Sequence, residues 1–231
     1  MFYIIFGFVF GALIPYMARR FSKFMPATMA YAIYRLIAPT KKVSKEKRRQ
    51  NGQYQRLMHK YLMRSLGWAV ICAALTYATY LCLPSAFYVA LVWILLLLYE
   101  IDERMFLLPD ILTVPLLIIG FIYAATIEPT HTYVFCLPAF YSAMGAAVGY
   151  LLPVLASLLM VKKHPDAFGG GDIKLLSAVG AWTGFEQIPA LILISALVFG
   201  VFCLAKRERI GAFGPAIVIS TLVLVFFKHF G

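Results

Sequence analysis

Long apolar runs separated by short polar stretches make up most of this chain. Runs of about 20 apolar residues can cross a hydrocarbon core roughly 30 Å thick as α-helices. The pattern predicts an all-α polytopic membrane protein with about eight transmembrane helices. The predicted segments are Phe2–Met17, Leu66–Leu83, Phe87–Leu98, Ile111–Thr126, Tyr133–Val161, Ile173–Thr183, Ile188–Ala205 and Ala212–Phe227.

Composition agrees with this pattern. Hydrophobic residues make up 62% of the chain and charged residues 13%, whereas soluble domains are about 45–50% apolar. The segment 173–183 is the shortest, and at about 1.5 Å per residue it covers well under the hydrocarbon thickness. We expect it to tilt little, to thin the bilayer or to begin below the surface. Either of the last two would bring Asp172 into the membrane.

Positive charge lies in alternate loops, and most of it lies in residues 18–64. The net charge is +11, but this distribution argues for membrane topology rather than for nucleic acid. The positive-inside rule places the N-terminus outside and residues 18–64 in the cytoplasm. We therefore divide the chain into a first transmembrane helix (1–17), a long basic cytoplasmic loop (18–64) and a multi-helix membrane core (65–231).

The basic loop has two interpretations. Its later part reads as a basic helix that runs into the second span, and it either attracts anionic lipid headgroups or simply anchors the topology. The first segment lacks a basic start and a small-residue cleavage site, so we expect a retained helix rather than a signal peptide. The four cysteines lie in or beside apolar segments without Cys-x-x-Cys spacing, and the histidines are scattered, so we expect neither a metal site nor a cofactor.

Two aspartates at the predicted cytoplasmic ends of apolar segments are the main candidates for chemistry. Asp102 follows the segment 87–98, and Asp172 follows three glycines, Gly169, Gly170 and Gly171. A carboxylate at the membrane edge costs a few kcal/mol, about 2.5–3.5 at a helix centre, and is therefore commonly functional. Glycines permit positive φ and close approach of another backbone. Paired aspartates, one ionised and one neutral, can hydrolyse a peptide bond.

Each aspartate also has a structural interpretation. Asp102 could be a solvated charge paired with Arg104. Asp172 could be the N-cap of the helix that follows it. Asp110, which follows a proline and precedes an apolar run, is a plausible N-cap and the main competitor for the second carboxylate.

The stretches 168–184, 101–116 and 213–215 together resemble a known family. The first resembles the Gly-x-Gly-Asp signature of the type IV prepilin peptidases, the second their other aspartate block, and the third their late Phe-Gly-Pro. The resemblance implies an eight-helix aspartic protease of the bacterial inner membrane. It would remove the short basic leader of prepilins or pseudopilins on the cytoplasmic side, cutting after a glycine. The catalytic pair would be Asp102 and Asp172. Residues 169–171 would form the active-site loop.

The chain departs from the family pattern in one respect. Many members carry two Cys-x-x-Cys pairs after the first helix, linked with metal binding and with N-methylation of the trimmed pilin, but residues 18–64 contain no cysteine. We therefore expect peptidase activity without methylation, or methylation by a cysteine-free variant. The alternatives are a proton-coupled transporter that uses the same two aspartates, an intramembrane aspartic protease for other signal peptides, and a noncatalytic assembly scaffold.

Overall fold

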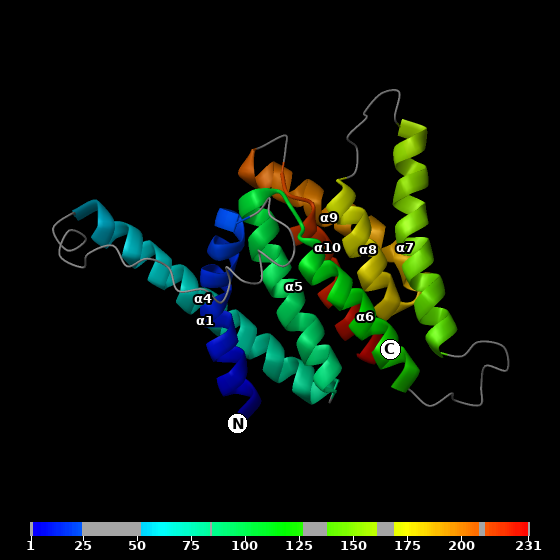
Figure 1. Ribbon diagram of the computed structural model, residues 1–231, viewed down its shortest axis with the longest axis horizontal. Helices are drawn as coiled ribbons and strands as arrows, with labels where there is room; N and C mark the ends of the chain where they lie inside the picture. Colours follow the sequence, from blue (N-terminus) through cyan, green and yellow to red (C-terminus); the bar gives the residue numbers. More distant parts are fainter. Residues whose placement is uncertain are drawn as a thin grey trace. The chain divides into compact units, whose positions relative to one another are not determined.

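The computed structural model is helical throughout the part of the chain that it describes, residues 2–24, 52–83, 85–126, 138–160, 169–207 and 211–230. No strand occurs in these residues, so the prediction of an all-helical fold is confirmed. In chain order the helices are α1 (Phe2–Phe24), α4 (Gly52–Cys82), α5 (Ala86–Met105), α6 (Asp110–Thr126), α7 (Pro138–Met160), α8 (Gly170–Thr183), the short 3₁₀-helix η1 (Phe185–Gln187), α9 (Ile188–Lys206) and α10 (Gly214–Phe230) (Figure 1).

Each predicted apolar segment falls on one of the described α-helices. Helices α6 and α10 are apolar but shorter than a full span. The helices are those of a multi-pass membrane protein, and the count of eight spans stays a prediction. In the part of the chain that the structure describes, four stretches are long and apolar enough to cross a membrane, namely Tyr3–Phe21, Met58–Cys82, Pro138–Leu158 and Phe185–Lys206.

Two helices enter the stretch 18–64 that the sequence assigned to a loop. Helix α1 continues to Phe24, and α4 already begins at Gly52. From Gly52 onward α4 agrees with the expected helix that runs into the second span, whereas the basic run 41–49 of that prediction lies outside the described residues. Residues 25–51, and with them most of the basic stretch, lie outside the described residues.

Contacts divide the chain into two compact units, Met1–Pro84 and Ser85–Gly231. In the first unit α1 packs against α4. The hydroxyl of Ser65 on α4 donates a hydrogen bond to the carbonyl oxygen of Ala12 on α1 at 2.7 Å. Both candidate aspartates belong to the second unit, which therefore carries the site.

Helix α8 lies at the centre of the second unit, in contact with α6, α7 and α10. It has 14 residues, and its last nine, 175–183, are buried apart from Ser177. At about 1.5 Å per residue it is only about 21 Å long. A helix enclosed by other helices does not have to match the bilayer thickness by itself, which explains how so short a segment is accommodated.

Close contacts hold α8 on two sides. Gly145 on α7 and Gly180 on α8 touch through their backbones, and a Cβ atom on either glycine would collide with the carbonyl group of the other. On the other side, Nε1 of Trp182 donates a hydrogen bond to the carbonyl oxygen of Leu116 on α6 at 2.9 Å. These contacts fix the helix whose first turn contains Asp172.

Candidate active site

Asp102 lies in the last turn of α5, where a run of buried aliphatic side chains ends. Residues 95–98 and Ile101 are buried, and Asp102 itself is only 4% exposed. The helix ends at Phe106, which adopts a left-handed conformation (φ 54°) and donates its N–H to the carbonyl oxygen of Asp102 at 2.9 Å. Asp102 therefore sits at a buried helix end.

The interpretation of Asp102 as a solvated charge paired with Arg104 is wrong. Nε of Arg104 donates a hydrogen bond to Oε1 of Glu100 at 2.7 Å, and Glu100 is fully buried. Residues four apart lie on the same face of a helix, whereas residues two apart do not. Arg104 thus reaches Glu100, one turn earlier, and leaves Asp102 on another face.

The start of α10 supplies a direct partner for Asp102. The backbone N–H of Gly214 donates a hydrogen bond to Oδ2 of Asp102 at 2.9 Å, and both groups are buried. A Cβ atom at position 214 would lie only 2.5 Å from the same oxygen. The site needs glycine here because only glycine lets the carboxylate approach this amide so closely.

Asp172 lies in the first turn of α8 and is not its N-cap. The N-cap is Gly169, and Asp172 is the third residue of the helix. The N–H of Asp172 donates a hydrogen bond to the carbonyl oxygen of Gly169 at 3.0 Å. The N-cap interpretation is therefore wrong in position, although a carboxylate in the first turn still interacts favourably with the helix dipole.

The three glycines act by close approach rather than by positive φ. Gly169 is extended (φ −66°), and neither Gly170 nor Gly171 has positive φ. A Cβ atom on Gly171 would lie 2.9 Å from Cβ of Leu108, in the segment that joins α5 to α6. Nothing lies within 4 Å of a Cβ atom at Gly170. Of the two uses expected for these glycines, the structure thus shows backbone proximity, at Gly171.

Asp102 and Asp172 line one cavity of about 410 Å³. Gly169 and aromatic and aliphatic side chains of α9 complete its wall together with Phe106 and the segment 211–213. The two aspartates, 70 positions apart in sequence (172 − 102), therefore face a common space. That space is large enough for a segment of extended peptide.

Burial raises the pKa of both carboxyl groups, which lie just outside the predicted spans 87–98 and 173–183. The pKa of Asp102 rises to about 6, although the hydrogen bond from Gly214 opposes the rise. The pKa of Asp172 rises to about 7, mainly through burial and further through the negative charge of Asp102, while the backbone of Gly169 opposes it. Because the charge of Asp102 acts on Asp172, the two carboxyl groups titrate as a coupled pair.

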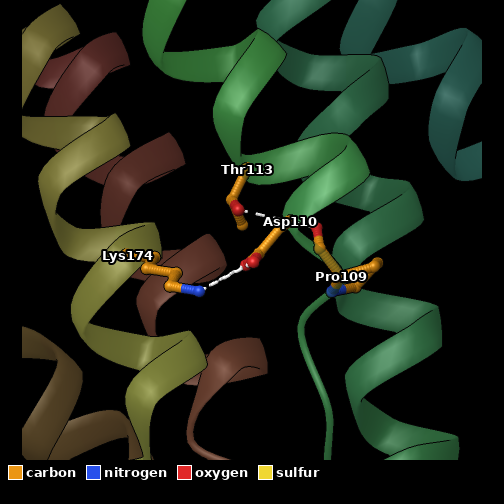
Figure 2. Close-up of polar contacts among 4 residues, drawn as sticks. All are labelled: Pro109, Asp110, Thr113 and Lys174. Atoms are coloured by element: carbon orange, nitrogen blue, oxygen red, sulfur yellow. Dashed lines mark hydrogen bonds and ion pairs between the residues drawn. The ribbon is translucent and has the colours of Figure 1, made fainter. Parts of the chain in front are cut away.

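Asp110 has a different partner (Figure 2), and it is not among the lining residues of this cavity. It is the first residue of α6, and both its carboxylate oxygens accept hydrogen bonds from Nζ of Lys174 on α8, at 2.7 and 2.8 Å. The ion pair is about half exposed on both sides. Asp110 is therefore occupied by a contact between helices, and the structure brings Asp172 to Asp102 instead.

No metal site can be assigned within the described ranges. Those residues contain no group of three or more histidine, cysteine, aspartate or glutamate side chains that could hold a metal ion. The polar groups that line the cavity are the two carboxyls and backbone amides.

Comparison with known families now decides the relationship. The profile of the type IV leader peptidase family matches residues 88–204, about half of the chain, and the match includes both aspartates. The chain belongs to the type IV leader peptidase family.

Several relatives of this chain share one name, prepilin leader peptidase/N-methyltransferase. The protein of Vibrio cholerae is 32% identical over 60% of this chain and 54% of its own length. That of Aeromonas salmonicida is 40% identical over 56% and 45%, and that of Escherichia coli K12 is 36% identical over 55% and 57%. The chain thus spans about half the length of these relatives. No solved structure matches it.

Sequence reasoning missed two features of the candidate active site. The Phe-Gly-Pro stretch 213–215 was noted only as a family motif, and its contact with Asp102 depends on how α10 packs against α5. The buried Glu100–Arg104 pair was also missed. Its signal was present in the sequence as a Glu and an Arg four residues apart on one helix.

Proposed function

We propose that this chain is a membrane aspartic endopeptidase that removes the short basic leader from type IV prepilins or pseudopilins. It cuts after a glycine, on the cytoplasmic side of the bacterial inner membrane. The observation that carries the proposal is the shared cavity, which is lined by two carboxyl groups whose pKa values are both raised. Family membership supports the choice of substrate.

Asp102 is the base in this proposal and Asp172 the acid. The N–H of Gly214 favours the ionised form of Asp102, and the charge of Asp102 in turn disfavours ionisation of Asp172. Ionised Asp102 takes a proton from water as the water oxygen attacks the carbonyl carbon. Neutral Asp172 gives its proton to the carbonyl oxygen, so the tetrahedral intermediate forms without a free negative charge.

Breakdown of the intermediate restores both groups. Asp102 passes its new proton to the leaving amine as the carbon–nitrogen bond breaks. Asp172 takes back a proton from one of the two hydroxyls, which leaves the carboxylic acid of the released leader. The cycle ends with Asp102 ionised and Asp172 neutral, as it began.

The packing of α5 favours this peptidase over the proton-relay alternative. A proton path needs polar groups at each depth of the membrane, but the buried residues of α5 before Glu100 are all leucine or valine.

The basic stretch 18–64 is proposed to contact anionic lipid, and residues 169–171 are proposed as the active-site loop.

The test compares the parent chain with Asp102→Asn and Asp172→Asn on a purified prepilin, and reads product size by mass spectrometry. Both variants should fold and lose leader removal. Asp110→Asn is the matched control, since it neutralises a nearby aspartate outside the cavity, and it should keep substantial activity. Full processing by Asp172→Asn would end the aspartic protease proposal.

A further inference from the structure

A second, smaller cavity adjoins the aspartate cavity and has no part in the mechanism above. It measures about 90 Å³, and α5, α9 and the start of α10 form its wall. Phe106 and Phe199 line both cavities, as does the segment 211–212. We call the smaller one the side cavity. Its principal lining residues are Tyr99, Phe106, Phe199, Phe202, Cys203 and Pro215.

The side cavity suits an apolar side chain. Four aromatic side chains lie in its wall, and of the described lining residues Glu103 and Lys206 are charged, are partly exposed and approach each other to 3.5 Å. An apolar cavity of about 150 Å³ can enclose benzene. A smaller cavity of about 90 Å³ therefore has room for a single side chain and for little else.

Phe106, in the wall between the cavities, combines a left-handed cap conformation with an exposed ring. It is a bulky residue in the left-handed region (φ 54°), where glycine is usual at a helix end. Its side chain is also 64% exposed. A costly conformation that holds an exposed ring beside a reactive site indicates a role in binding.

We propose that the side cavity binds one apolar side chain of the substrate, that of the first residue after the cleaved bond. This rests on the proposed function. The residue before the bond is then glycine, which has no side chain to bind, and the leader is basic, which the positive charge of Lys206 in the wall disfavours. The shared wall places the occupant next to the bond that Asp102 and Asp172 attack.

The first test measures specificity. Prepilin peptides that differ only at the first residue after the glycine, with Leu, Phe, Ala or Asp there, are cut by the parent chain and by two tryptophan variants. Cys203→Trp fills the side cavity. Leu204→Trp is the matched control, because Leu204 is the next residue of α9, is 80% exposed and lines neither cavity.

The parent should prefer Leu or Phe over Ala at least tenfold in kcat/KM. Cys203→Trp should lose most of that preference, chiefly through KM, and Leu204→Trp should keep it. Equal preference in all three proteins would overturn the side-cavity proposal while leaving the peptidase intact. If the parent cuts no prepilin, the proposed function fails, and the second test judges the cavity by itself.

The second test measures occupancy without cleavage. The full chain with Asp172→Asn, and with Cys72, Cys82 and Cys136 changed to alanine, keeps Cys203 as its single thiol. The peptide with Leu after the glycine should slow maleimide alkylation of Cys203 at least threefold, and the peptide with Asp there should not. Equal protection by both peptides, or protection by neither, would overturn the proposal.

Discussion

The backbone N–H of Gly214 and the carboxylate of Asp102 form a buried hydrogen bond of 2.9 Å across a separation of 112 residues. The donor is the first amide of α10, so the positive end of that helix also lies at the carboxylate. Both effects favour ionised Asp102. The contact thus joins α10 to the proposed catalytic pair and distinguishes the two aspartates.

Gly214→Ala should lower kcat at least tenfold, because the new methyl group would lie 2.5 Å from Oδ2 of Asp102 and displace it. Gly200→Ala on α9 is the matched control, since nothing lies within 4 Å of a Cβ atom there. The measurement is kcat and KM on a prepilin, with thermal unfolding to verify folding. Unchanged kcat in Gly214→Ala would show that this contact does not position Asp102.

Cleavage should follow a bell-shaped pH profile with its optimum between about pH 6 and 7. Below the pKa of Asp102, about 6, the base is protonated and cannot accept the proton of water. Above the pKa of Asp172, about 7, the acid is ionised and cannot donate. Initial rates from pH 4 to 9 would measure both limbs, which belong to the pair as a whole. A rate that kept rising to pH 9 would contradict a neutral acid.

Phe106→Gly should stabilise the protein while weakening its discrimination among substrates. Glycine adopts the left-handed conformation without the cost of roughly 1–2 kcal/mol that other residues bear, and the greater freedom of the unfolded chain offsets part of the gain. A net gain of about 0.5–1 kcal/mol is expected from these principles. The preference for Leu over Ala after the cleaved bond should fall.

Arg207→Gly is the control for this substitution. Arg207 ends α9 in the same left-handed conformation (φ 54°) but lines neither cavity. It should gain similar stability, measured by thermal unfolding, with unchanged preference. If Arg207→Gly altered the preference as much as Phe106→Gly, the effect would not belong to the wall of the side cavity.

Sequence periodicity located the helices well because burial in lipid or protein demands long apolar runs. It could also single out Asp102 and Asp172, since a carboxylate is conspicuous beside such runs. Local sequence does not contain the packing that joins them: whether Asp102 faces Arg104 or Gly214 depends on how α10 docks on α5. Likewise, α8 is too short to span a bilayer by itself, and only its packing between α6 and α7 explains its length.

Helix ends were the least predictable part. Positive φ and close approach of another backbone were both expected at the glycines before Asp172; none of them has positive φ, and Gly171 matters because Leu108 lies against it. At Phe106 the reverse holds, since a bulky residue takes the conformation that glycine prefers. Sequence gives the usual preference of each residue type, and a functional site is where that preference can be overridden.

The Asp110–Lys174 ion pair should make only a modest contribution to activity. Exposed pairs are typically worth about 0.2–1 kcal/mol, or less than about fivefold in a rate or equilibrium constant. Asp110→Asn and Lys174→Gln should each retain substantial activity, and the double variant should be no worse than the weaker single one. Thermal unfolding and kcat/KM over this double-mutant cycle provide the measurement. Loss of activity in Asp110→Asn as complete as in Asp172→Asn would place Asp110 among the catalytic groups.

The trimmed product should carry a mainly unmethylated N-terminus, and zinc chelators should leave cleavage unchanged. The relatives named for both activities are about twice as long as the stretch they share with this chain, and residues 18–64 contain no cysteine for a zinc–thiolate site. Mass spectrometry of a pilin cleaved in the presence of a methyl donor would test this, with a known methylating relative as the positive control. A product uniformly heavier by one methyl group would show that this chain methylates without those cysteines, and loss of cleavage in a chelator would reveal a metal requirement.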